Sequence, residues 1–212
     1  MARSAAAVVY VHGLWMPGLE GALLRRRLTA ERGYRCHVFR YHSVGEPMAR
    51  VTASLRTLVT RIEAPQVHLL GHSLGALVIL RFLQCHAMAQ PGRVLFLAPP
   101  AAGSRAARFL GRLSLGRRAL GRAVAEELLT ERLRRWDVGR ELGIIAGTAP
   151  VGLGHLLLTF REDNDGVLAV SETELAGAKS HLCLPVNHSG MLLSARVARE
   201  AGSFLEYGRF GA

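Results

Sequence analysis

The chain is 212 residues long, half of them hydrophobic and 20% charged, which excludes a disordered protein and fits one domain with a substantial core. Its formal net charge of +11 would suit anionic lipid, acidic substrates or nucleic acid alike, so charge by itself excludes none of these partners. No apolar run reaches the roughly 20 residues of a membrane span, and the three cysteines lack the paired spacing of a disulfide framework or a zinc site.

The first predicted element is a strand at Ala7–Val11, which begins only a few residues into the sequence. Cleavage of a signal peptide would remove this strand from the fold, so we recognise no export signal. We therefore expect a cytoplasmic protein.

Short β-rich runs alternate with longer helical patterns along the rest of the chain. This alternation predicts an α/β protein with a mostly parallel, six-stranded sheet and helices on both of its faces. The predicted strands are Ala7–Val11, Cys36–Tyr41, Gln66–Leu70, Arg93–Leu97, Leu142–Ala146 and His181–Val186. The predicted helices are Leu19–Glu31, Pro47–Ile62, Leu74–Ala89 and Ser189–Tyr207. Cys85 and Cys183 fall inside these apolar segments and are expected to be buried thiols.

The segment from Ser104 to Arg140 is too long for a single crossover helix. It holds ten arginines against four acidic residues, and its regularly spaced glycines weaken any long helix. We predict two or three short helices here, which form a lid or insertion within a single domain spanning residues 1–212. Because apolar residues interleave with the arginines, the segment would either dock on anionic lipid or form a solvated helix pair.

The sequence Gly71-His72-Ser73-Leu74-Gly75 matches the Gly-x-Ser-x-Gly pattern. The pattern alone is weak evidence, because chains rich in glycine match it by chance. Its context strengthens it, since a predicted strand enters the motif and a predicted helix leaves it. A strained turn between strand and helix would lift a serine hydroxyl above the sheet. Ser73 is therefore the candidate nucleophile, and the alternative is a glycine-rich turn with an incidental serine.

His12 and Gly13 directly follow the first predicted strand. A serine that attacks a carbonyl generates a negative oxygen, which needs two preorganised N–H donors. The candidates are the backbone N–H of Leu74, at the start of a helix, and the backbone N–H of Leu14. Leu14 and Trp15 would also line an acyl pocket. The alternative for His12 is a loop histidine that binds only the local backbone.

The stretch Val9-Tyr10-Val11-His12-Gly13, taken together with Gly71-His72-Ser73-Leu74-Gly75, resembles the small lipases and esterases of the α/β-hydrolase superfamily. The resemblance covers most of the chain by order of elements, and residues 104–140 least well. It implies the α/β-hydrolase fold and a serine hydrolase that cleaves acyl esters, with a nucleophile elbow and an oxyanion hole. Thioesterase or acyltransferase activity would use the same residues.

Such a hydrolase needs a histidine that accepts the serine proton and a carboxylate that orients it, in the chain order Ser, Asp or Glu, His. This order leaves His155, His181 and His188 as candidates. His181 would lie at the wrong end of the sheet, and His155 is too near the fifth strand. His188 lies between the last strand and the last helix, where the family has its base. We therefore predict His188, whose alternative role is a helix-capping loop residue.

Three acidic residues, Glu162, Asp163 and Asp165, lie in the loop after the fifth predicted strand, the family's usual location for the acid. Asp165 begins an Asp-Gly-Val-Leu run that resembles the family's Asp-x-x-Val pattern. We predict Asp165 as the acid, with Asp163 as the alternative. The spacing does not match an EF-hand loop, so no Ca²⁺ site is expected.

The predicted reaction is acylation of Ser73 followed by hydrolysis, and it needs no cofactor and no metal. Trp15 and Met191 are predicted to contact the substrate, a small-molecule or lipid acyl ester, and an anionic membrane surface is a further predicted partner. Nucleic acid is not expected, because no recognition motif is present and aromatic residues make up only 6% of the chain. The rival from another class is a basic, non-catalytic binding protein of the same fold.

Overall fold

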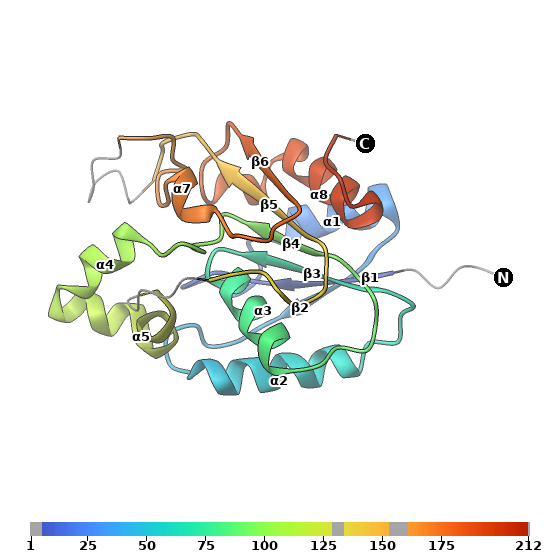
Figure 1. The fold of residues 1–212 in the computed structure, drawn as a ribbon, viewed down its shortest axis with the longest axis horizontal. Coiled ribbons are helices and arrows are strands. Elements are labelled where there is room, and N and C mark those ends of the chain that lie inside the picture. Colours follow the sequence, from blue (N-terminus) through green and yellow to red (C-terminus); the bar gives the residue numbers. More distant parts are fainter. Residues whose placement is uncertain (1–5, 129–133, 153–160, 212) are drawn as a thin grey trace.

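The computed structural model describes residues 6–128, 134–152 and 161–211. Its centre is one sheet of six strands in the order β2-β1-β3-β4-β5-β6, and every neighbouring pair is parallel (Figure 1). The strands are β1 (Ala7–Val11), β2 (Arg35–Phe39), β3 (Val67–His72), β4 (Val94–Leu97), β5 (Leu142–Gly147) and β6 (Ser180–Leu184). The predicted α/β-hydrolase arrangement of strands and helices is thereby confirmed.

Helices cover both faces of this sheet (Figure 1). The helices are α1 (Ala22–Arg32), α2 (Met48–Thr60), α3 (Leu74–Cys85), α4 (Arg105–Gly111), α5 (Ser114–Leu128), α7 (Val170–Thr173) and α8 (Ala195–Tyr207), with a 3₁₀ turn at Gly190–Leu192. Helices α1 and α8 pack on one face, and α2 and α3 pack on the other. Among the helices of the described residues, none combines the length and the apolar character that crossing a membrane requires.

The hydrophobic pattern of the central strands follows from this two-sided cover. All five residues of β1 are buried, with Val9 and Val11 in the cluster that includes α2 and α3, and Val8 and Tyr10 in the cluster that includes α1 and α8. Strands buried on both faces are continuous hydrophobic runs rather than alternating ones. Because all strands run the same way, the loops that follow them meet at one edge of the sheet, here called the carboxyl edge.

The segment after β4 contains α4 and α5, which lie at this carboxyl edge (Figure 1). Helix α5 is interrupted at Gly121, whose φ of 74° and ψ of −179° are not helical. A Cβ at Gly121 would lie 2.1 Å from the carbonyl oxygen of Val44, so glycine is required there. The segment is thus built from short helices, as the spaced glycines predict, although residues 129–133 of it lie outside the described residues.

Some local predictions are wrong. The last helix begins at Ala195 rather than Ser189, because the Ser194 side chain caps it by accepting a hydrogen bond from the Val197 N–H. Cys85 and Cys183 are exposed rather than buried. Cys85 is the last residue of α3, and Cys183 lies on the outward side of the edge strand β6, where burial alternates.

Candidate active site

Ser73 occupies a strained turn between β3 and α3. Its φ of 53° and ψ of −122° are unusual for a residue with a side chain. The flanking glycines make the turn possible, since a Cβ at Gly71 would lie 2.7 Å from the Ala76 nitrogen and one at Gly75 would lie 2.1 Å from the Val11 carbonyl oxygen. Such backbone strain costs about 1–3 kcal/mol and is found most often at functional sites.

His188 and Asp165 form a buried pair in the loops after β6 and β5. The His188 Nδ1 lies 2.6 Å from the Asp165 Oδ2, and the His188 backbone N–H donates to the Asp165 carbonyl oxygen at 2.9 Å. The other carboxylate oxygen, Oδ1, accepts backbone N–H groups of Val167 at 2.9 Å and Leu168 at 2.7 Å. The carboxylate is therefore held in one orientation against the imidazole.

The surroundings of Asp165 keep it ionised. Burial alone would raise the pKa of this carboxyl, but the adjacent His188 and the backbone N–H donors outweigh burial and hold the pKa below its usual value. An ionised carboxylate at Nδ1 leaves Nε2 as the nitrogen of His188 that can accept a proton.

Ser73 and His188 line the same cavity, so the structure brings Ser73, Asp165 and His188 to one edge of the sheet. Within the described residues, the Ser73 hydroxyl forms no hydrogen bond with His188. Hydrogen bonds of this kind are often long until a substrate is bound. The alternative acid, Asp163, is exposed and makes no contact with His188 among the described hydrogen bonds.

The two other candidate bases are not at this site. His181 is on β6, and its Nε2 lies 2.9 Å from the Thr173 Oγ1. His155 lies outside the described residues.

The proposed oxyanion donors, Leu14 and Leu74, also line this cavity. No acceptor for the backbone N–H of either residue is found in the described parts of the chain. The loop that carries Leu14 runs close to the serine, because a Cβ at Gly13 would lie 3.2 Å from the Ser73 Cβ. Trp15, by contrast, donates its backbone N–H to the Ser43 Oγ at 3.1 Å and cannot serve as a further donor.

His12 and Tyr41 hold this loop in place. The Tyr41 hydroxyl donates to the His12 carbonyl oxygen at 3.0 Å, the Tyr41 backbone N–H donates to His12 Nε2 at 3.3 Å, and the two rings stack with centroids 4.4 Å apart. His12 Nδ1 lies 2.9 Å from the Gly13 carbonyl oxygen, and burial lowers the pKa of His12, so a neutral ring that donates from Nδ1 fits both contacts. The side chain of His12 therefore contacts the local backbone at Gly13, as the alternative for this residue predicted, and in addition contacts Tyr41.

Sequence reasoning missed Tyr41 and Ser43 as supports of this loop. Both follow β2, the neighbour of β1 in the sheet, so the loops after the two strands meet at the carboxyl edge. A polar residue directly after a predicted neighbouring strand is the signal that could have identified them.

His72 is a third residue, after Tyr41 and Ser43, whose contact at the site the sequence did not reveal. Its Nε2 lies 3.0 Å from the carbonyl oxygen of His188, and the two rings have centroids 4.9 Å apart. Burial, with a smaller contribution from His188, lowers the pKa of His72 to about 3, so the ring is neutral near pH 7. A neutral ring that meets a carbonyl at Nε2 must carry its hydrogen there. In the described structure its buried Nδ1 has no hydrogen-bond partner.

The cavity above Ser73 has a volume of about 540 Å³ and a largely apolar lining. The lining includes residues of the β1–α1 loop, α3, α4, α5 and the two loops that carry Asp165 and His188: Gly13, Leu14, Trp15, Met16, Ser73, Leu74, Pro100, Ser104, Ala106, Ala107, Leu110, Leu120, Leu128, Val167, Leu168, His188 and Ser189. No Arg, Lys, Asp or Glu side chain is among these residues. The site can therefore accept a neutral, apolar group.

Trp15 lines this cavity as predicted, and Met191 does not. Trp15 is 54% exposed, has a φ of 58°, and donates its indole N–H to the carbonyl oxygen of Ala119 on α5 at 2.9 Å. Met191 is 0% exposed and belongs to the core cluster beneath α8. The prediction of substrate contact is therefore corrected for Met191, because the 3₁₀ turn after His188 directs it into the core.

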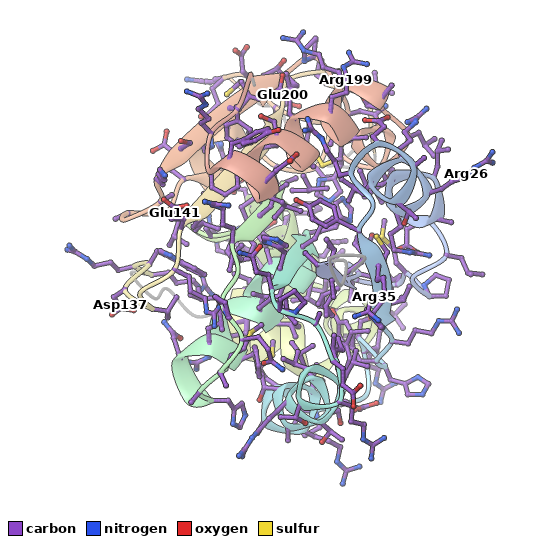
Figure 2. The ribbon with its side chains drawn as sticks, turned by 90° about the vertical axis from the view of Figure 1, so that its right-hand side faces the viewer. Arg26, Arg35, Asp137, Glu141, Arg199 and Glu200 are labelled. Atoms are coloured by element: carbon purple, nitrogen blue, oxygen red, sulfur yellow. The ribbon has the colours of Figure 1, made fainter. Side chains whose placement is uncertain are left out.

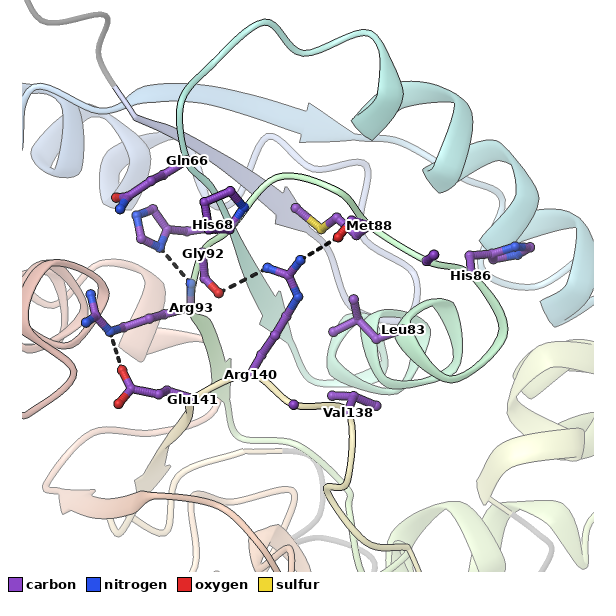
Figure 3. Close-up of a pocket in the computed structure, with 13 residues that line it drawn as sticks. Gln66, His68, Leu83, His86, Met88, Gly92, Arg93, Val138, Arg140 and Glu141 are labelled. Carbon is purple, nitrogen blue, oxygen red and sulfur yellow. Dashed lines mark hydrogen bonds and ion pairs between the residues drawn. The ribbon is translucent and has the colours of Figure 1, made fainter.

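A second cavity, of about 620 Å³, lies where β3, β4 and β5 begin, at the edge of the sheet opposite the carboxyl edge. Figure 3 shows its lining residues. Arg140 donates to the carbonyl oxygens of Gly92 at 3.1 Å and of Met88 and Gln90 at 2.8 Å. The Arg93 backbone N–H donates to the Nδ1 of His68 at 3.0 Å. These polar groups are occupied in joining the α3–β4 loop to the start of β5, so this cavity has a structural character.

Comparisons with known proteins agree with this fold. The profile described as "Alpha/beta hydrolase family" matches residues 8–200. No match is found among curated proteins.

Several solved structures share the fold at low identity. A metagenomic carboxyl esterase has a TM-score of 0.67 at 20% identity, over 90% of this chain and 66% of that one. A pyrethroid hydrolase from Sphingobium faniae JZ-2 has a TM-score of 0.67 at 17% identity, over 96% of this chain and 98% of that one. Phospholipase PlaB from Legionella pneumophila has a TM-score of 0.59 at 17% identity, over 80% and 46%. The chain thus spans less than two thirds of the esterase and about half of the phospholipase, and at these identities the likeness shows the fold alone.

Proposed function

Because the chain belongs to the alpha/beta hydrolase family, we propose that it is a serine hydrolase that cleaves carboxylic esters through an acyl-enzyme on Ser73. The observation that carries the proposal is the buried Asp165–His188 pair, with Oδ2 and Nδ1 2.6 Å apart, whose histidine lines the same cavity as the strained Ser73. A carboxylate that orients an imidazole beside a serine on a strand-to-helix turn supports activation of that serine as a nucleophile.

In the first proposed step, His188 accepts the hydroxyl proton through Nε2 while the Ser73 Oγ attacks the ester carbonyl carbon. Asp165 remains ionised and stabilises the imidazolium that forms. The backbone N–H groups of Leu14 and Leu74 donate to the carbonyl oxygen as it becomes negative, which is the largest single contribution in many enzymes of this chemistry. The tetrahedral intermediate then collapses, and the leaving alcohol takes the proton from His188.

In the second proposed step, water attacks the acyl-enzyme. His188 accepts a proton from the water, and the same two N–H groups stabilise the second tetrahedral intermediate. Collapse releases a carboxylic acid and returns the proton to Ser73. Each step forms one acyl–oxygen bond and breaks another, and the proton returns to Ser73, so the reaction balances without a cofactor or a metal.

The apolar cavity supports a substrate with a neutral, apolar acyl group. A site of about 540 Å³ lies within the usual range for small-molecule pockets. The similar structures are those of a carboxyl esterase, a phospholipase and a pyrethroid hydrolase, which fits ester substrates of varied size. A thioesterase or acyltransferase is the second candidate, since an apolar acyl group would enter the same cavity and the same residues would carry the reaction.

A series of p-nitrophenyl esters with acyl chains of rising length tests the proposal. Hydrolysis should be measurable for the wild type and abolished in Ser73→Ala. Ser54→Ala, at an exposed position on α2, is the matched control and should retain wild-type rates. Equal, measurable rates for Ser73→Ala and the control would contradict the proposal, and no hydrolysis by any of the three chains would favour a non-catalytic binding protein.

A further inference from the structure

We propose that the α4–α5 hairpin, residues 105–128, docks the site on an anionic lipid surface. Docking itself does not require catalysis. Only the idea that the lipid surface supplies the substrate rests on the proposed hydrolase function. The hairpin forms the greater part of the segment 104–140 predicted as a lid or insertion.

Exposed apolar side chains gather at the carboxyl edge. Of the eight large apolar side chains exposed in the described structure, seven belong to the loops that follow β1, β5 and β6 or to the α4–α5 segment that follows β4. The eighth, Tyr207, is the last residue of α8. Single exposed apolar residues are ordinary, but a group of them at one edge of the sheet indicates an interaction surface.

The tip of the hairpin is the most exposed part of this group. Leu113, in the turn between α4 and α5, is 53% exposed, and Leu115, in the first turn of α5, is 77% exposed. The turn is tight, because a Cβ at Gly116 would lie 2.2 Å from the carbonyl oxygen of Leu110. The two leucines therefore project from a fixed support, and burying them in an acyl-chain layer would recover their hydrophobic free energy.

The charge of the hairpin selects the kind of surface. Residues 105–128 contain six arginines and two glutamates, and both glutamates lie at the end of α5. Arg112 and Arg118 flank the two leucines and are exposed, and in the parts of the chain that the structure describes neither takes part in a salt bridge. Basic residues beside apolar ones suit anionic headgroups above an acyl layer.

The inner side of the same hairpin lines the cavity. Ala107 and Leu110 of α4 and Leu120 of α5 contribute to its wall, and the Trp15 indole N–H binds the Ala119 carbonyl oxygen of α5. A hairpin seated on lipid would thus bring the mouth of the cavity to the bilayer. An acyl chain could then reach Ser73 with little passage through water.

Nucleic acid would engage the arginines but would leave Leu113 and Leu115 in water, so a lipid surface fits both observations better. The two partners are separated by the experiment below.

The test is co-sedimentation of the full chain carrying Ser73→Ala with sucrose-loaded vesicles. This variant binds without turnover, so failure of docking and failure of the proposed catalysis are distinguishable. We expect binding to vesicles of three parts phosphatidylcholine and one part phosphatidylglycerol, at least tenfold weaker binding to phosphatidylcholine alone, and a fall in binding from 0.1 to 0.5 M NaCl.

Two pairs of variants locate the surface. Arg112→Gln with Arg118→Gln should weaken binding to the anionic vesicles roughly 20-fold, whereas Arg26→Gln with Arg199→Gln should leave it unchanged, because these two arginines lie on the face turned away from the hairpin (Figure 2). Leu113→Ser with Leu115→Ser should weaken binding at least tenfold, whereas Tyr207→Ser on α8 should not.

The proposal is overturned if the Ser73→Ala chain does not sediment with the anionic vesicles, or if both arginine pairs weaken binding equally. Retention by duplex DNA at the same ionic strength, without vesicle binding, would overturn it in favour of nucleic acid. Because the salt and lipid-composition comparisons use an otherwise unchanged chain, they remain decisive even if a double variant fails to fold.

Discussion

Replacing His72 by leucine is expected to lower kcat/KM for an ester by about 10- to 100-fold. The Nε2 of His72 lies 3.0 Å from the carbonyl oxygen of His188, and this is the contact between the elbow and the loop of the proposed base. Leucine would leave a buried carbonyl without its donor, a loss of about 1–3 kcal/mol, and each 1.4 kcal/mol in the transition state is a factor of ten. The loss should fall mainly on kcat, since His72 is not among the cavity-lining residues.

Glutamine and asparagine sharpen this prediction. The amide nitrogen of glutamine stands as many bonds from the backbone as His72 Nε2, so His72→Gln should retain activity within about threefold. The asparagine nitrogen stands only as far as Nδ1 and should not rescue. The assay is kcat and KM across pH 5–9, with thermal unfolding of each variant as a control. Because His72 is neutral over this range, its replacement by glutamine should not move the acidic limb of the profile. Equal activities of the leucine and glutamine variants would refute a positioning role.

Three further predictions concern the acid, the second cavity and pH. Asp165→Asn should lower kcat about 10²- to 10⁴-fold, because His188 would lose its correct tautomer. Asp163→Asn should leave kcat within about threefold. The ester assay of the two variants decides which aspartate is the acid. Arg140→Met should destabilise the fold by about 2–3 kcal/mol in urea unfolding, because three backbone carbonyls lose a charged donor, and an unchanged midpoint would contradict this. Burial lowers the pKa of His68 to about 4, so between pH 6.5 and 4 the unfolded chain binds a proton at this residue that the folded chain does not. The free energy of unfolding should therefore fall as the pH drops over this range. It should fall less steeply in His68→Gln.

Most of the fold could be predicted because both periodicity and the order of elements carried information. β1 is at Ala7–Val11, as predicted, since a fully buried strand is a short apolar run bounded by loop residues. The end of α3 could not be predicted. Helix α3 ends at Cys85, because His86 adopts an extended conformation with φ of −135°. The apolar pattern continues past His86, so local propensity alone does not predict where the helix ends.

The candidate site was predictable in part. Ser73, Asp165 and His188 meet because the loops after parallel strands share one edge, and the order of strands along the chain is readable from sequence. Their catalytic roles stay a prediction. Met191 was misplaced because a residue beside a site residue can face the core, and spacing does not reveal which way a 3₁₀ turn directs it. The contact between His72 and His188 joins residues 116 positions apart, which no local pattern encodes.

The central claim is that Ser73 is the reacting nucleophile, and covalent labelling tests it most directly. The wild-type chain is treated with a fluorophosphonate, digested, and analysed by peptide mass spectrometry. The proposed function predicts a single phosphonyl adduct on Ser73, and much slower labelling in His188→Ala, where the serine has lost its base. Absence of an adduct on the folded chain, or an adduct on another serine, would contradict the proposal.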